Sequence, residues 1–240
     1  MEKIYGSRYS GVFVLHRTTP CLSKKRQDGR GISRRENRID LTLATIFIIA
    51  GPPGIGKSTS GNHFIPKDVK IIDPDLISER YKLEGFSDYK DIGNVRFQDI
   101  TQKALFSGED FAIELNLGFQ SHYDYLKSLH NVNRDNRIAL VLFYTDHLHL
   151  CLTRAALRHR HGLHLVPPET IREMYDQTFP LLERHFSLID QITFVHVSDA
   201  ENPVVCAQFD NKAKELTTTN TYPAWFEHQA MAILNPLKGK

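Results

Sequence analysis

The chain has 240 residues, a formal net charge of +2 and an ordinary globular composition, so its length fits one domain with a sizeable core. No apolar run approaches the ~18 residues that a membrane-spanning helix needs. Cys21, Cys151 and Cys206 are too widely spaced for a zinc motif or a disulfide framework. These features exclude a membrane-embedded protein and a disulfide-rich secreted domain, and we expect a cytoplasmic protein with reduced thiols.

Residues 1–44 differ in character from the rest of the chain. They carry ten Lys/Arg and four Asp/Glu, a balance of +6, and almost no apolar periodicity. We expect a basic, flexible extension here. The alternative is a basic arm that touches nucleic acid, a membrane or a partner. The remaining residues have a balance of −4, which does not favour a nucleic-acid-binding surface on the main domain.

From residue 45 onward, apolar runs alternate with stretches of helical spacing. Apolar runs at 46–50, 69–72, 111–113, 138–144 and 192–197 are separated by helical patterns, among them 94–107, 121–130, 146–161 and 168–188. This alternation predicts a three-layer α/β/α domain at 45–200, with a mostly parallel sheet of five strands. The runs at 204–209 and 216–219 indicate a C-terminal hairpin, so we expect residues 201–240 to form a hairpin and tail packed on that domain.

The most specific motif follows the first apolar run. Gly51, Gly56, Lys57 and Ser58 satisfy G-x-x-x-x-G-K-[ST], the phosphate-binding loop. Glycines allow the backbone N–H groups to turn inward, and the N-terminus of the following helix adds to this anion cradle. Lys57 is expected to contact the β/γ-phosphates, and Ser58 to bind Mg²⁺. The predicted nucleotide-binding residues are Gly51, Pro52, Pro53, Gly54, Ile55, Gly56, Lys57, Ser58 and Thr59.

Acidic side chains follow the second and third strands, at the edge of the sheet where ligands bind in open α/β folds. Asp73 and Asp75 flank Pro74, which we expect to keep the backbone extended or turned, and Glu114 ends the third strand. Carboxylates beside a polyphosphate can orient a hydroxyl nucleophile or bind Mg²⁺ directly or through water. The alternative for any one of them is helix capping or a surface salt bridge.

A basic segment follows the fourth strand, with Arg154 and Arg158 four residues apart on one helix face. Arg158 and Arg160 can face one phosphate only if the helix ends near Arg160, and Gly162 favours such an end. Such arginines can stabilise charge on a transferring phosphoryl group, although a solvated basic face is the alternative. The neighbouring arginines disfavour a metal site on the nearby histidines, and we interpret His164 as a substrate or lid residue.

These residues, in this order, resemble the zeta-toxin family of P-loop kinases over about residues 45–197. The resemblance rests on the phosphate loop, on Ile72-Asp73-Pro74-Asp75, on Glu114, and on a segment similar to the family's R-x-x-x-R-V-R-x-G-G-H-x-V-P signature, here at 154–167. It implies a kinase that uses ATP and Mg²⁺, with the 3′-hydroxyl of UDP-N-acetylglucosamine as the acceptor in characterised members. It also implies Lys57, Asp75, Arg158 and Arg160 as catalytic residues, with Asp75 as the base that aims the hydroxyl, and Asp73, Glu114, Asn116 and His164 at the substrate.

Two departures from the family concern the acceptor. The family's E-T-T-L-S-G-R is replaced by Glu114-Leu115-Asn116-Leu117-Gly118-Phe119-Gln120, which lacks the hydroxyls and the arginine, although Asn116 can still form hydrogen bonds. The second glycine of G-G-H is Leu163. These changes do not affect the residues that are expected to bind the nucleotide. They concern the acceptor, because the loop after Glu114 helps to form the acceptor pocket in the family.

The sequence therefore predicts a kinase that transfers the γ-phosphoryl group of ATP to a hydroxyl, for example on a nucleotide sugar, with an antitoxin as a candidate partner. One alternative is a P-loop kinase that acts on a polynucleotide end or another metabolite. Another is a non-enzymatic nucleotide-binding module of a toxin–antitoxin pair. No N-K-x-D guanine-binding motif is present, and the sequence leaves the choice between ATP and GTP open.

Overall fold

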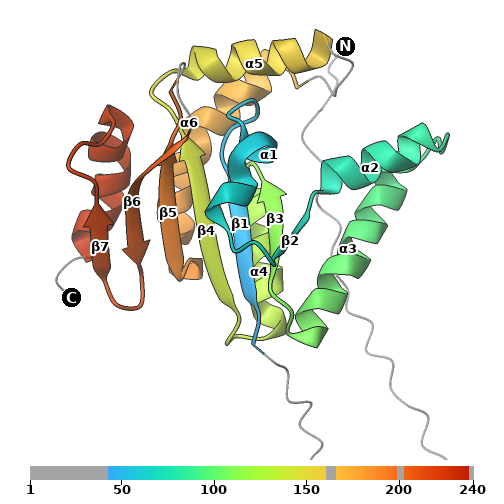
Figure 1. Cartoon of the computed structure of the whole chain (residues 1–240), viewed down its shortest axis with the longest axis horizontal. Coiled ribbons are helices and arrows are strands. Elements are labelled where there is room, and N and C mark those ends of the chain that lie inside the picture. The colour runs from blue at the N-terminus through green and yellow to red at the C-terminus, as the bar shows by residue number, and fades with distance from the viewer. Residues whose placement is uncertain (1–42, 161–165, 199–202, 238–240) are drawn as a thin grey trace, which may run out of the picture. The chain divides into compact units, whose positions relative to one another are not determined.

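The computed structural model describes residues 43–160, 166–198 and 203–237. The predicted extension at 1–44 thus falls almost wholly outside the described residues. The described residues form a compact unit around a seven-stranded sheet with the order β2-β3-β1-β4-β5-β6-β7 (Figure 1). The strands are β1 (Thr45–Ala50), β2 (Lys70–Ile72), β3 (Phe111–Leu115), β4 (Arg137–Tyr144), β5 (Gln191–His196), β6 (Val204–Asp210) and β7 (Glu215–Thr218).

Strands β1 to β5 pair in parallel, as the sequence predicts, because a helical segment connects each of these apolar runs to the next. The predicted C-terminal hairpin is present as β6 and β7, which pair antiparallel. Strand β6 also pairs with β5, so the hairpin extends the main sheet, which has seven strands and not five.

The sheet buries apolar side chains on both faces. In β1, Ile46 and Ile48 belong to one core, and the intervening Ile49 belongs to the other, as the two-residue period of a strand requires. The first core includes residues of α3 (Tyr89–Ser107), α4 (Gln120–Val132) and α6 (Pro168–His185). The second lies beneath the phosphate loop, which leads into α1 (Lys57–Ser60), and beneath α5 (Leu148–Arg160). These two layers of helices complete the predicted α/β/α arrangement.

Helix α2 (Pro74–Leu83) was not predicted. The extended backbone expected around Pro74 is found only at Asp73, and Pro74 begins the helix. Proline fits the first helical turn because its missing N–H has no partner there in any helix. Helix α2 packs against α3 at close range, since a Cβ on Gly93 of α3 would collide with Ser78 of α2. The two helices form the pair at the right of Figure 1.

The C-terminal segment covers the end of the first core. Trp225 is buried and is followed by a π-helix at Phe226–Ala230, by α7 (Met231–Leu234) and by a 3₁₀ turn at Asn235–Leu237. Its indole Nε1–H donates to His196 Nδ1 at 3.1 Å, and its backbone N–H donates to Asp146 Oδ1 at 2.8 Å. Two further 3₁₀ turns lie at Gly61–Phe64 and Phe186–Leu188. Among the described helices, none combines the length and the apolar character that a membrane crossing requires.

Candidate active site

The phosphate loop leaves β1 at Gly51 and lies on the backbone of its neighbours. Gly51 and Gly54 have φ angles of 142° and 82°, which L side chains rarely adopt. A Cβ on Gly51 would collide with the carbonyl of Phe143 in β4, and a Cβ on Gly54 would collide with the carbonyl of Cys151 in α5. The loop is therefore packed directly between the end of β4 and α5.

Lys57 is only 6% exposed and lies inside this loop. Its Nζ donates to Gly51 O at 2.8 Å, to Pro52 O at 3.2 Å and to Asn116 Oδ1 at 2.8 Å. An ammonium group has three hydrogens, so these contacts use all of its donors. Burial lowers the pKa of Lys57, while the nearby Glu114 and Asp75 carboxylates oppose that shift.

Glu114 lies beside the phosphate loop because β3 pairs with β1. The register sets Ile49 against Glu114, one residue before the end of β1. The Ser58 hydroxyl donates to Glu114 Oε1 at 2.8 Å. Burial raises the pKa of Glu114, and the Lys57 charge and the Ser58 hydrogen bond act in the opposite direction. Ser58 and Glu114 thus present adjacent oxygen ligands, the type that Mg²⁺ prefers.

The segment after Glu114 is held in place by its own backbone. Asn116 follows Glu114 by two residues, so the end of β3 directs one side chain to Ser58 and the other to Lys57. The next residue, Leu117, is 1% exposed and has a φ of 51°, a left-handed conformation that is uncommon for leucine. Gly118 then packs against Met174 of α6, where a Cβ would be only 2.5 Å from the Met174 backbone.

The two aspartates beside Pro74 have different positions. Asp73 Oδ1 accepts from the backbone N–H groups of Asp75 and Leu76, at 2.8 and 3.2 Å, so its carboxylate caps α2. Burial raises the pKa of Asp73. Asp75 lies in the first turn of α2, is exposed, and is close enough to influence the charges of both Lys57 and Glu114. The Asp73 carboxylate is thus used in capping α2, whereas the Asp75 carboxylate does not take part in that cap.

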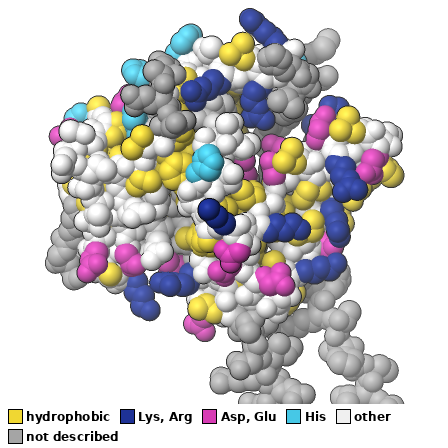
Figure 2. All heavy atoms as spheres, in the orientation of Figure 1, with side chains coloured by type: hydrophobic (Ala, Val, Ile, Leu, Met, Phe, Trp, Pro, Cys, Tyr) yellow, Lys and Arg dark blue, Asp and Glu magenta, His cyan; other side chains and the backbone are white. Residues whose placement is uncertain are grey.

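Helix α5 brings arginines to the phosphate loop. Lys and Arg side chains gather over α5 at the top of Figure 2. Arg158 is close enough to lower the pKa of Lys57, whereas Arg160 is exposed and is the last residue of α5. Arg154, which we did not predict as a site residue, donates from Nη1 to Ile55 O in the loop at 3.4 Å. Its four-residue spacing from Arg158 was the signal that could have identified it.

The other predicted nucleotide-binding residues lie in the phosphate loop or in α1. Pro52, Pro53 and Ile55 are buried within the loop, and Thr59 is exposed on α1. His164 and the adjacent Gly162 lie outside the described residues.

His122 in the first turn of α4 is a site neighbour that carried no sequence signal. It is 8% exposed, and its Nδ1 accepts from the Phe119 backbone N–H at 3.3 Å. Burial, together with the Lys57 charge, lowers the pKa of His122 to about 4. The imidazole is therefore neutral near pH 7 and adds no charge beside Lys57.

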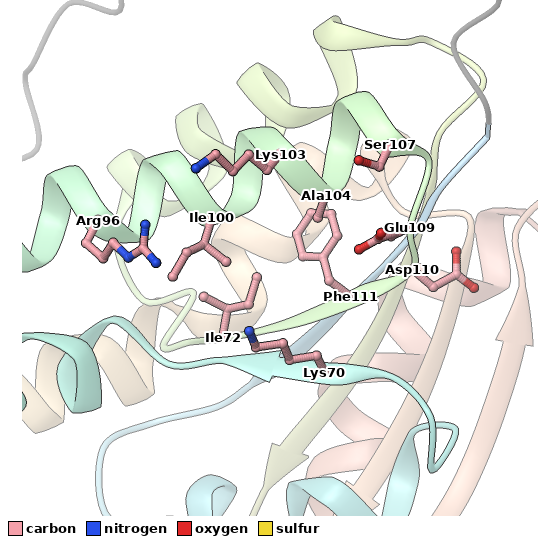
Figure 3. Close-up of a pocket in the computed structure, with 10 residues that line it drawn as sticks. All are labelled: Lys70, Ile72, Arg96, Ile100, Lys103, Ala104, Ser107, Glu109, Asp110 and Phe111. Atoms are coloured by element: carbon pink, nitrogen blue, oxygen red, sulfur yellow. The ribbon is translucent and has the colours of Figure 1, made fainter.

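A separate cavity of about 300 Å³ lies between α3 and β2 (Figure 3). Its apolar floor includes Ile72 and Phe111, and Lys70, Arg96 and Lys103 are among the polar groups at its rim. The cavity runs along β2 from Lys70, the first residue of that strand, to Ile72, the last. Strand β2 is the edge strand of the sheet and β3 separates it from β1, so the cavity is separate from the phosphate loop.

Comparisons with known proteins bear on the fold. No family model and no curated protein matches this sequence. The solved structure of AvrRxo1-ORF1 with AvrRxo1-ORF2 and ATP is similar, with 12% identity over 75% of this chain and 61% of that chain, and a TM-score of 0.56. The PezAT chromosomal toxin–antitoxin system of Streptococcus pneumoniae is similar at 16% identity, over 86% of this chain and 92% of that chain, with a TM-score of 0.53.

The chain shares the three-layer fold of these two structures. It spans about three-fifths of the AvrRxo1 chain that it matches. The predicted three-layer architecture is confirmed by these structures and by the sheet itself. At these identities the similarity concerns the fold, so the activity has to be argued from the site.

Proposed function

We propose that this protein is an ATP-dependent kinase that transfers the γ-phosphoryl group to a hydroxyl on a small molecule. The observation that carries the proposal is the meeting, at one edge of the sheet, of a phosphate loop with two carboxylates from different elements. Lys57 is hydrogen-bonded within the loop, Ser58 contacts Glu114, and Asp75 is close enough to act on both charges. A site that only bound nucleotide would not require an exposed carboxylate free of capping contacts beside the phosphates.

Each residue of the site has a role in the proposed phosphoryl transfer. The loop N–H groups and Lys57 bind and orient the phosphates, and Arg158 adds positive charge from α5. Asp75 accepts the proton of the acceptor hydroxyl and directs its oxygen toward the γ-phosphorus. Arg160, at the end of α5, is assigned to the same phosphates. Asp73 holds α2, and therefore Asp75, in position through its capping hydrogen bonds.

The residues at the loop also fit Mg²⁺. Ser58 Oγ and Glu114 Oε1 are oxygen atoms 2.8 Å apart beside the phosphate loop, and hard oxygen ligands are what Mg²⁺ selects. Bound there with the nucleotide, the ion would neutralise charge on the phosphates. Ser58 would be its direct ligand, and Glu114 would contact it through water.

For the acceptor, we propose a nucleotide sugar such as UDP-N-acetylglucosamine, as the resemblance to zeta toxins implies. Asn116 and His164 are the residues assigned to it beside Glu114. The resemblance also implies an antitoxin partner. The PezAT system supports this possibility because it is a toxin–antitoxin system that shares the fold.

The test combines labelling with one substitution. The protein is incubated with γ-labelled ATP and a panel of nucleotide sugars, nucleosides and oligonucleotides, and labelled products are identified. Asp75→Asn should abolish transfer and leave ATP binding nearly unchanged, because it removes the base and keeps the shape. Asp91→Asn on the neighbouring helix α3 is the matched control and should retain full activity.

Each other outcome assigns a different function. Substantial transfer by Asp75→Asn would show that the assigned base is wrong. Labelled oligonucleotide would identify a polynucleotide kinase, and ATP binding without transfer to any acceptor would identify a non-enzymatic module.

A further inference from the structure

We propose that Asn116 is a positioning residue that accepts a hydrogen bond from Lys57 and yields this contact to an incoming polyphosphate. This inference rests on the proposed function, because it concerns the same nucleotide site. It goes further in assigning to Asn116 control over how tightly the polyphosphate is bound.

The hydrogen-bonding capacity of Lys57 is fully used. Its three ammonium hydrogens are donated to Gly51 O, Pro52 O and Asn116 Oδ1. A phosphate oxygen can accept from Lys57 only if one of these contacts breaks. Binding of the polyphosphate therefore includes the loss of at least one hydrogen bond within the protein.

Of the three acceptors of Lys57, the Asn116 side chain is the most able to move away. Gly51 cannot withdraw its carbonyl easily, since its backbone is pressed against the carbonyl of Phe143. Pro52 is buried in the same loop. Asn116 contributes a side-chain oxygen, which moves by rotation about χ angles alone. The Asn116 contact is therefore the one that the phosphate replaces.

The two residues that follow Asn116 stay in place when its side chain rotates. Leu117 is buried with a φ of 51°, and Gly118 is packed on Met174. These neighbours fix the backbone of Asn116, so its amide must compete with the phosphate from a constant position. How strongly Asn116 competes with phosphate for Lys57 therefore depends on the chemistry of the Asn116 side chain alone.

Two substitutions at Asn116 are expected to act in opposite directions. Asn116→Ala removes the competing acceptor and leaves a buried donor to be satisfied by phosphate, so the dissociation constant for ATP should fall roughly fivefold. Asn116→Asp turns the contact into an ion pair of the same size, so the dissociation constant should rise roughly tenfold. Damage to the fold would weaken binding in both variants.

The experiment is isothermal titration of the full chain with ATP and with AMP, in EDTA to remove metal ions. AMP lacks the β- and γ-phosphates, so its affinity should change less than about twofold in Asn116→Ala. Asn131→Ala, an exposed position on α4, is the matched control. Asn116→Ser provides a second short side chain, and thermal unfolding confirms that each variant is folded.

A double-mutant cycle with Lys57 completes the test. In a Lys57→Met background, Asn116→Ala should no longer alter ATP affinity, because the group that it releases is gone. If Asn116→Ala and Asn116→Ser weaken ATP binding or leave it unchanged, or alter AMP binding equally, the inference is wrong. Absence of ATP binding by the unmodified protein would instead refute the proposed function, so the two failures are distinguishable.

Discussion

The Ser58 hydroxyl donates a 2.8 Å hydrogen bond to Glu114 Oε1, which joins the phosphate loop to the neighbouring strand β3. The pair joins the residue that we propose as the Mg²⁺ ligand to a carboxylate whose pKa is raised by burial. Their 56-residue separation is bridged by the parallel pairing of β1 with β3.

Glu114→Gln should lower the rate of phosphoryl transfer at least about tenfold at a fixed, limiting Mg²⁺ concentration. Glutamine preserves the size of the side chain and removes the charge that attracts the ion, so higher Mg²⁺ should restore part of the rate. The measurement is the Mg²⁺ dependence of transfer. Glu109→Gln, at the opposite edge of the sheet, is the control, and a wild-type Mg²⁺ profile for Glu114→Gln would contradict the role in metal binding.

Gly54→Ala should reduce the free energy of unfolding by about 3 kcal/mol or more, through backbone strain and collision with the carbonyl of Cys151. Gly85→Ala is the matched comparison. Gly85 has a similar φ of 89°, but a Cβ there would meet nothing within 4 Å, so only strain of about 1–2 kcal/mol applies. Urea unfolding measures both variants. Equal losses would mean that the loop is not packed against α5.

The buried His122 should make the protein less stable in acid. Its pKa is about 4 when folded and 6.5 when unfolded, so the unfolded chain binds the proton more readily. The contribution is fully present above pH 6.5 and is lost as the pH falls from 6.5 to 4. It amounts to about 3 kcal/mol.

Urea unfolding between pH 7 and pH 4 tests this account of His122. His122→Gln should flatten the decline in stability, whereas His63→Gln, at an exposed position, should retain it. A decline in His122→Gln that matches the unmodified protein would assign the acid sensitivity to other groups.

Trp225→Phe should cost about 1–2 kcal/mol of unfolding free energy, because it removes the indole hydrogen bond to His196 and leaves that acceptor unpaired. Trp225→Ala should cost about 3–5 kcal/mol through the cavity that it creates. Circular dichroism follows unfolding of the variants, with Tyr222→Phe, a partly exposed neighbour, as the control. Neutral effects of both Trp225 substitutions would show that the C-terminal segment unfolds separately from the sheet.

The sequence predicted the elements whose burial leaves a clear pattern. Strands β1 and β4 are continuous apolar runs, and the phosphate loop is defined by residue type and spacing, so both were recognisable. Helix α2 was missed because none of its described residues is buried, and without a buried stripe there is no helical period to detect. Asp73 followed by Pro74 was nevertheless an available N-cap signal.

The contacts within the site were harder to predict from the sequence than the identities of its residues. Arg154 reaches Ile55 across 99 residues, and Lys57 reaches Asn116 across 59. Such contacts depend on strand order, since placing β3 beside β1 is what brings Asn116 to the loop. The sequence named Asn116 as a substrate residue, and its hydrogen bond to Lys57 became evident only in the structure. His122 has no motif, and its importance comes entirely from burial.

Helix α2 differs from the phosphate loop in how firmly it is anchored. The loop is formed by buried backbone, whereas the ten described residues of α2 include no buried side chain. Local opening of such a helix costs far less free energy than global unfolding, so its amides should exchange with solvent sooner than those of β1. Asp75 lies in the first turn of α2, which means that the proposed base moves with a readily opened element. ATP would then bind to the rigid phosphate loop. An acceptor that contacts α2 would bind only while that helix is folded.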